Sequence, residues 1–133
     1  MKDIDIQALR NLTYGLFVLT SRVNEKDNGC IINVAAQVTE NPMRITIAIN
    51  KNNYSHDLIL ASRQFNLNML TEETPMRIFE HFGFQSGRNV NKFEDCTWAA
   101  RSANGILYLS QFINGHISGE VEQTVDLGSH TLL

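Results

Sequence analysis

Residues 29–56 read GCIINVAAQVTENPMRITIAINKNNYSH, and two unlike patterns meet in this stretch. Within the segment 44–50, three isoleucines occupy every second position: Ile45, Ile47 and Ile49. This alternation is typical of a strand that packs one face against a core. The later half of the stretch is therefore predicted to be a structural strand of a β-rich domain.

The segment that precedes this strand, residues 33–39, carries small and polar side chains in place of bulky ones. Its position between two apolar segments predicts that it is buried. Short side chains would let a flat ligand lie against the backbone, and the amides of Asn33 and Gln37 offer hydrogen bonds to it. Residues 33–39 are therefore candidate ligand contacts, with an ordinary strand and turn as the alternative.

The segment 50–56, NKNNYSH, supplies a cation, a hydroxyl and several amides at the point where the strand should give way to a helix. Free N–H groups and the positive end of the helix dipole meet at a helix start, which favours anions. Composition and periodicity alone thus indicate a small β-rich domain with an anionic ligand.

The composition is that of an ordinary soluble globular domain, with 43% hydrophobic and 19% charged residues in 133. A chain of this length is predicted to form one domain, residues 1–133, whose core needs no disulfides. The net charge is −3, from 11 basic and 14 acidic residues, so no general attraction to nucleic acid or to an anionic membrane is expected.

No window approaches the roughly 18 apolar residues of a membrane span, and the first residues, MKDIDI, lack the apolar run of a signal peptide. We therefore expect a cytoplasmic protein. Cys30 and Cys96 are far apart in the sequence and belong to no C-x-x-C pair, and the histidines are scattered at positions 56, 81, 116 and 130. No disulfide framework and no metal site are predicted, and both cysteines are interpreted as buried thiols.

The N-terminal part of the chain is predicted to contain a helix, a strand and a hairpin turn. Residues 3–12 place apolar side chains at three-residue steps, which suits a short amphipathic helix: Ile6, Leu9 and Leu12. Residues 14–20 form a compact apolar run, predicted to be a buried strand. A tight turn is predicted at Asn28-Gly29.

The C-terminal part of the chain continues with two helices and further strands. Ser55 is predicted to cap a helix over residues 56–62, and Thr74 a second helix that ends near Gly83. Strands are predicted where apolar residues alternate or cluster, and a second hairpin turn is predicted between the last two of them: 65–69, 106–113, 117–126 and the turn Asn114-Gly115. Strands outnumber helices, which favours a closed or partly closed antiparallel barrel.

The order of these motifs resembles the flavin reductase-like FMN-binding split-barrel family, in the branch that includes flavoredoxins and the flavin domain of high-molecular-weight rubredoxin. The resemblance runs from about residue 14 to the end and includes FNLNML at 65–70, FGFQSGRNVNKF at 82–93 and GSH at 128–130. It implies a mainly β, antiparallel, Greek-key-like split barrel with short helices. Family members continue past residue 133, so the sequence leaves open whether this domain is naturally short or truncated at its C-terminal part.

The resemblance implies an FMN-dependent oxidoreductase, a flavin reductase that takes electrons from NAD(P)H or a protein donor and passes them to a soluble acceptor. It also implies a homodimer with the cofactor at the interface. Two alternatives stay open. One is a flavoredoxin-like electron carrier with no substrate pocket, whose partner is a rubredoxin or an iron–sulfur protein, and the other is a shortened domain that binds no flavin.

The resemblance also assigns site residues. It implies that the flavin ring is bordered by Asn33, Val34, Ala35, Gln37, Val38 and Thr39, and that the ribityl phosphate is bound by Asn50, Lys51, Ser55 and His56. Arg88 is a second candidate cation, with a surface ion pair as its alternative role. The GSH segment is similar to the family's GDH motif beside the nicotinamide site, so His130 is a candidate for positioning the donor or substrate, although Ser129 replaces the acidic residue.

Overall fold

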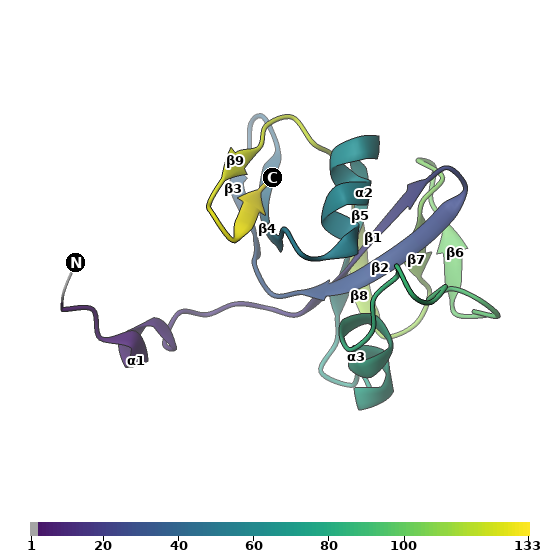
Figure 1. The fold of residues 1–133 in the computed structure, drawn as a ribbon, viewed down its shortest axis with the longest axis horizontal. Coiled ribbons are helices and arrows are strands. Elements are labelled where there is room, and N and C mark those ends of the chain that lie inside the picture. Colours follow the sequence, from purple (N-terminus) through teal and green to yellow (C-terminus); the bar gives the residue numbers. More distant parts are fainter. Residues whose placement is uncertain (1–2) are drawn as a thin grey trace.

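The computed structural model describes residues 3–133, and its body is built from antiparallel sheets (Figure 1). The larger sheet has four strands in the order β2-β1-β5-β8. These strands are β1 (Phe17–Val23), β2 (Lys26–Ile32), β5 (Gln64–Leu70) and β8 (Ile113–Glu120). All neighbours in this sheet are antiparallel.

A smaller sheet of four strands has the order β3-β4-β10-β9. Its strands are β3 (Ala35–Thr39), β4 (Arg44–Asn50), β9 (Val125–Asp126) and β10 (His130–Leu132). A separate hairpin joins β6 (Ala99–Arg101) to β7 (Leu107–Leu109). The predicted mainly β, antiparallel architecture is confirmed.

Three short helices accompany the sheets: α1 (Ile6–Leu9), α2 (Tyr54–Ser62) and α3 (Met76–Gly83). Helix α2 lies between the small and the large sheet in Figure 1 and buries Leu58 and Ile59. Helix α3 buries Ile78 and Phe82 under the large sheet. Within residues 3–133, no helix is long and apolar enough to cross a membrane.

The main core joins the two sheets. Ile47 and Ile49 of β4 are each 1% exposed and belong to one cluster with buried residues of β1, α2 and β5: Leu19, Ile59, Phe65 and Leu67. The predicted inward face of strand 44–50 is thus confirmed. Packing of these side chains removes apolar surface from water and holds the small sheet against the large one.

A row of buried amides in β5 holds the β6–β7 hairpin. Asn68 is fully buried, and its Nδ2 donates to Val18 O at 2.9 Å while its Oδ1 accepts from Leu109 N at 2.9 Å. Asn66 donates from Nδ2 to Ile106 O at 3.1 Å. The prediction that this strand is only half-buried is wrong, because the hairpin covers its polar face and saturates the amides.

The hairpin turn predicted at Asn28-Gly29 is wrong. The chain turns instead at Asn24 and Glu25, whose φ values of 51° and 66° match the two left-handed positions of a tight hairpin turn. Asn28 and Gly29 lie inside β2. Gly29 is needed there for packing, since an added Cβ would lie 3.0 Å from the Phe82 ring.

The C-terminal strands also differ from the prediction. Asn114 and Gly115 lie inside β8, which pairs with β5, so the second predicted turn is absent. Strand 106–113 shrinks to β7, and the alternating run 117–126 is divided between the end of β8 and the two residues of β9. The alternating pattern over residues 117–126 was wrongly interpreted as one strand, because β8 and β9 belong to different sheets.

The helix boundaries are corrected as well. The predicted helix 3–12 contracts to α1, and its apolar stripe is exposed: Ile6, Leu9 and Leu12. Asn53, and not Ser55, caps α2 by accepting from Ser55 N at 3.0 Å. Thr74 does not cap α3, because its hydroxyl donates to Thr71 O and Phe112 O.

Replacing Asn68 by Ala should lower the free energy of unfolding by about 2–4 kcal/mol, because the change leaves a buried N–H and a cavity behind. Urea unfolding followed by circular dichroism measures the effect. Asn114→Ala, at an exposed position of β8, is the matched control and should stay within about 0.5 kcal/mol of the parent protein. Equal decreases in the free energy of unfolding for the two variants would contradict the structural role assigned to Asn68.

Candidate functional site

Strand β3 carries the small and polar residues and forms an open edge of the small sheet. Val34 and Val38 are 43% and 58% exposed, and the other residues between 33 and 39 are exposed or half-buried. The prediction that this segment is buried is wrong, because β4 pairs with one side of β3 and no strand among residues 3–133 pairs with the other. Its backbone and short side chains are therefore accessible to a ligand.

The β3–β4 ladder contains an irregularity at the middle of the candidate contacts. The register shifts between Gln37 and Thr39, which leaves Val38 out of the regular pairing. Such bulges re-aim side chains and interrupt ladder hydrogen bonds. Gln37 Nε2 donates to Thr39 O at 3.2 Å across this bulge.

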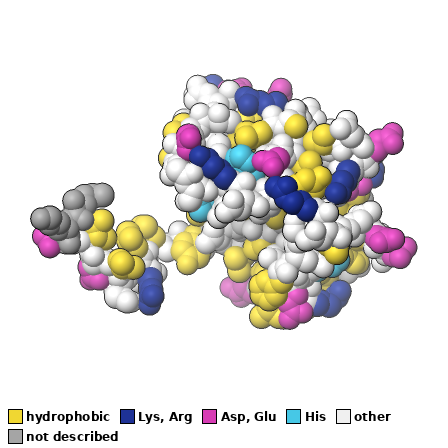
Figure 2. Space-filling model, viewed as in Figure 1, with side chains coloured by type: hydrophobic (Ala, Val, Ile, Leu, Met, Phe, Trp, Pro, Cys, Tyr) yellow, Lys and Arg dark blue, Asp and Glu magenta, His cyan; other side chains and the backbone are white. Residues whose placement is uncertain are grey.

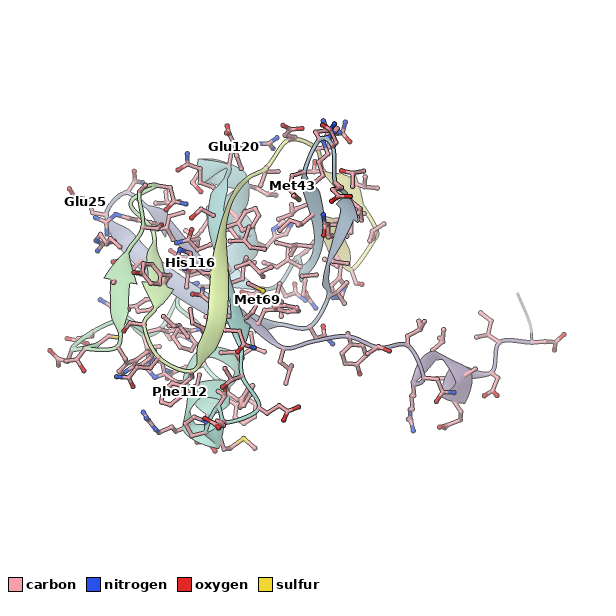
Figure 3. The ribbon with its side chains drawn as sticks, turned by 180° about the vertical axis from the view of Figure 1, so that it is seen from behind. Glu25, Met43, Met69, Phe112, His116 and Glu120 are labelled. Carbon is pink, nitrogen blue, oxygen red and sulfur yellow. The ribbon has the colours of Figure 1, made fainter. Side chains whose placement is uncertain are left out.

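A cleft of about 540 Å³ separates the small sheet from β8, and its lining is mainly apolar. Met43 and Glu120 stand at the same end of this cleft in the rear view of Figure 3. Among the predicted contacts, Val38 and Thr39 reach it. The volume is within the range of small-molecule sites, so the cleft can accept an apolar ring or an apolar protein segment.

Lys51 lies where the end of β4 meets the turn before β10. Its Nζ donates to Asp126 Oδ1 at 2.6 Å, and its backbone N donates to Ser129 O at 3.0 Å. The hydrogen bond from Lys51 lowers the pKa of Asp126 below its ordinary value. Asn50 is paired with His130 in the β4–β10 ladder. The fold thus brings Asn50, Lys51 and His130 together.

His130 itself is half-buried, and its Nδ1 lies 2.8 Å from the hydroxyl of Ser129. Ser129, which stands where the similar GDH motif has an acidic residue, therefore contacts the imidazole of His130. A neutral hydroxyl offers a weaker, uncharged partner than a carboxylate would.

The Ser55 side chain points into the protein. It is fully buried, and its Oγ accepts from Asn28 Nδ2 at 2.8 Å. This bond fastens the start of α2 to β2. Asn28 Oδ1 has no hydrogen-bond partner in the structure although it is buried.

His56 is also buried, and it links α2 to the C-terminal strand. Its Nε2 lies 2.8 Å from Thr131 Oγ1 of β10, and its Nδ1 lies 3.0 Å from Asp57 Oδ1. The two imidazole nitrogens are occupied by these contacts. His56 and Ser55 therefore position the surrounding elements from beneath the surface.

Arg88 reaches the same helix from the loop after α3. Its Nη2 donates to Asp57 Oδ2 at 3.1 Å, and its guanidinium lies 4.9 Å from the centre of the Tyr54 ring. Lys26 Nζ lies 4.7 Å from the same ring and donates to Gly87 O at 2.9 Å. Figure 2 shows basic, acidic and histidine side chains next to one another on this face.

Lys26 and Tyr54 were missed in the sequence. Lys26 belongs to a polar and charged segment, and nothing in the local sequence connects it to α2. The NYSH segment contains Tyr54, and this was the available signal, since an aromatic ring at a helix start can hold cations by their charge.

Lys92 is a buried cation that supports the loop carrying Arg88. Its Nζ donates to Gly29 O at 2.7 Å and to Phe82 O at 2.8 Å. Burial lowers the pKa of this amine. Two backbone carbonyls thus hold Lys92 inside, where it joins β2, α3 and the loop.

The two thiols are not placed for nucleophilic chemistry. Burial raises the pKa of the Cys30 thiol, and the nearby Ser55, Lys92 and Asn53 side chains oppose this only in part. Cys96 is half-buried rather than buried, and burial raises its pKa too. A raised pKa keeps a thiol protonated near neutral pH. In the described part of the chain, no three His, Cys, Asp or Glu side chains are grouped to hold a metal ion.

Comparison with known proteins identifies a matching family. The family model described as "Flavin reductase like domain" matches residues 9–133. The high molecular weight rubredoxin of Moorella thermoacetica is 35% identical over 97% of this chain, and the ferric-chelate reductase (NAD(P)H) of Archaeoglobus fulgidus is 31% identical over 97%. The matched regions span 56% and 76% of those two proteins.

Solved structures show the same fold. The FMN-binding protein from Thermus thermophilus superposes with a TM-score of 0.84 at 20% identity, over 99% of this chain and 72% of that one. Flavoredoxin from Methanosarcina acetivorans superposes with a TM-score of 0.80 at 16% identity, over 99% of this chain and 70% of that one. The predicted split-barrel fold is confirmed.

Replacing Gly87 by Ala should disturb the loop that carries Arg88. The added Cβ would lie 2.1 Å from Asn28 Oδ1 and 3.0 Å from Tyr54 Cδ2, so we expect the free energy of unfolding to fall by about 1–3 kcal/mol. Gly115→Ala is the matched control, because its Cβ would make an ordinary contact of 3.6 Å with Met69. Thermal and urea unfolding compare the two, and an unaffected Gly87→Ala variant would contradict the packing described.

Proposed function

The chain belongs to the flavin reductase like domain family, and on this premise we propose that it binds FMN and acts as an FMN-dependent oxidoreductase. Electrons would come from NAD(P)H or a protein donor and pass to a soluble acceptor. The observation that carries the proposal is that one fold of this family presents both an exposed, small-residue strand and a group of cations at a helix start. When bound, FMN supplies the chemistry of accepting a hydride or electrons and handing them on.

The exposed strand fits a flat ring. The segment 33–39 offers backbone groups and short side chains on an edge that no strand of residues 3–133 covers. Val34 and Val38 provide apolar contact area, and Gln37 provides an amide. These residues would border the isoalloxazine and exclude water from one of its faces.

The cations fit a phosphate. Lys51, Arg88 and Lys26 lie around the first turn of α2, and each is now engaged by an acid, a carbonyl or a ring that an anion can join or replace. Ammonium and guanidinium groups form strong, charge-assisted hydrogen bonds with phosphate oxygens. Ser55 and His56 are proposed to fix the helix start and β10 rather than to touch the phosphate, because both are buried.

His130 is proposed to position the electron donor or the substrate. It follows the turn that also contacts Lys51, so it lies next to the proposed phosphate seat. With Ser129 as its neighbour, the imidazole lacks the charged partner of a GDH motif. The ferric-chelate reductase among the relatives is named as an NAD(P)H enzyme, which supports a nicotinamide donor for this chain.

The second candidate function is a flavin-binding electron carrier. It is favoured by the similarity to a high molecular weight rubredoxin and to flavoredoxin. In this case the partner would be a rubredoxin or an iron–sulfur protein. A homodimer is part of both proposals.

Replacing Lys51 by Ala should weaken FMN binding about tenfold, roughly 1.4 kcal/mol, because one phosphate cation is lost. Fluorescence titration of FMN into the purified protein measures the affinity. Arg77→Ala, an exposed cation on α3 near Phe112, is the control and should bind like the parent protein. Equal affinities would remove Lys51 from the site, and failure of the parent protein to bind FMN would favour a domain that has lost its cofactor.

Replacing His130 by Ala should lower NADH oxidation several-fold while FMN affinity stays within about twofold, because the imidazole acts on the donor and not on the cofactor. Stopped-flow reduction of the FMN-loaded protein gives the rate. Flavin that is reduced by dithionite or a protein donor but not by NADH or NADPH would favour the carrier. An unchanged rate in the variant would leave His130 with a structural role.

A further inference from the structure

The proposed phosphate seat consists of Lys51, Arg88 and Lys26, and two of these cations are each paired with a carboxylate. Lys51 Nζ lies 2.6 Å from Asp126 Oδ1, and Arg88 Nη2 lies 3.1 Å from Asp57 Oδ2. The four side chains of these pairs are at least 37% exposed, so a ligand can reach both pairs. The positive charge of the phosphate seat is therefore partly offset by the chain's own acids.

The backbone around Asp126 holds its carboxylate opposite Lys51. Asp126 pairs with Thr131 in the β9–β10 ladder, and its Oδ1 also accepts from Gly128 N at 2.8 Å. An aspartate that bonds the backbone two residues further on forms an Asx turn, which restricts its side chain. Lys51 N donates to Ser129 O of the same turn at 3.0 Å. The ammonium and the carboxylate are therefore kept together by backbone bonds as well as by their charges.

Asp126 is the simpler of the two carboxylates. The hydrogen bond from Lys51 is the main cause that lowers the pKa of Asp126, so this side chain carries its negative charge at neutral pH. The carboxylate of Asp57 is shared, because its Oδ1 lies 3.0 Å from His56 Nδ1 while its Oδ2 accepts from Arg88. A change at Asp126 can therefore test the charge of the phosphate seat without disturbing the buried contacts of α2.

We propose that Asp126 is a specificity-determining residue of the phosphate seat, a carboxylate that competes with the phosphate of FMN for Lys51. A phosphate monoester carries close to two negative charges at neutral pH, and it accepts the same charge-assisted hydrogen bonds as a carboxylate. Phosphate binding must therefore break or share the Lys51–Asp126 pair, and this lowers the affinity. The inference rests on the proposed function and deepens it, because it concerns how the same site selects its ligand.

The competition determines how well the phosphate seat distinguishes FMN from riboflavin. Three cations and two carboxylates leave the phosphate seat with one net positive charge. Riboflavin has the same ring and ribityl chain but no phosphate, so its binding leaves the Lys51–Asp126 pair intact. The parent protein should therefore prefer FMN only modestly, and removal of the Asp126 charge should increase the preference. Most of the gain is expected as slower release of FMN.

The first experiment is titration of FMN and of riboflavin into the parent protein and into an Asp126→Asn variant, followed by flavin fluorescence. Asparagine keeps the acceptor for Gly128 N and removes the charge, so the turn stays intact. The variant should bind FMN about threefold to fivefold more tightly than the parent protein does, because an exposed ion pair no longer has to be broken. Its affinity for riboflavin should be unchanged.

The matched control is Glu122→Gln. Glu122 pairs with Arg44 at 2.9 Å, in another exposed ion pair, at the end of β4 that is opposite to Lys51. The control variant should bind both flavins as the parent protein does, although it loses the same charge. Three results would overturn the proposal: an Asp126→Asn variant that binds FMN no better than the parent protein, an equal gain for riboflavin, or an equal gain in the control.

A second measurement separates this inference from the proposed function. Inorganic phosphate, and separately FMN, is added to the parent protein at constant ionic strength, and NMR follows the side-chain carboxyl carbon of Asp126 with the amides of Lys51 and Gly128. A ligand that takes Lys51 from Asp126 should move these signals together and saturably, whereas chloride should not. A response to phosphate without FMN binding would support the competition and refute the proposed function. No response to either ligand would overturn the inference even if FMN binds elsewhere on the protein.

Discussion

The packing of Ile47 and Ile49 against the core of the large sheet is the constraint on which the remaining structure depends. These two side chains hold β4 inside the protein, and β4 in turn places β3 on one side of itself and β10 on the other. If β4 were loosened, the exposed edge, the Lys51 loop and His130 would lose their common support. A strand in the core thus determines where the polar groups of the surface lie.

Helix α2 adds the second part of the candidate site to this arrangement. Its first turn is tied to β2 through Ser55 and Asn28, and to β10 through His56 and Thr131. Ser55 and His56, which the sequence suggested as ligand contacts, therefore connect the elements of the fold to one another. The groups left at the surface are cations, and they come from β2, the end of β4 and the loop after α3. The candidate site is assembled from distant segments, and buried hydrogen bonds hold the scaffold beneath it.

Local signals in the sequence succeeded where packing agreed with them and failed where it did not. The alternating isoleucines were interpreted correctly because burial on one face is what produces a two-residue period. Asn28-Gly29 was misinterpreted as a turn, because Gly29 is needed beside Phe82 and Asn28 beside Ser55. Asn114-Gly115 was misinterpreted too, because both residues lie inside β8, which pairs with β5. Lys26 was missed, since its partner Tyr54 is distant in the sequence.

By itself, the sequence determined the mainly β class, the inward face of β4 and, through the motifs at 29–56, 82–93 and 128–130, the family. Periodicity and motif order are local properties, and local properties can be read along a chain. Only the tertiary structure decided that β3 is an open edge of the small sheet among residues 3–133, that Ser55 and His56 lie beneath the surface, and that the large apolar side chains between residues 4 and 16 are exposed. Exposure depends on which distant segments pack together, and the core packing decides this.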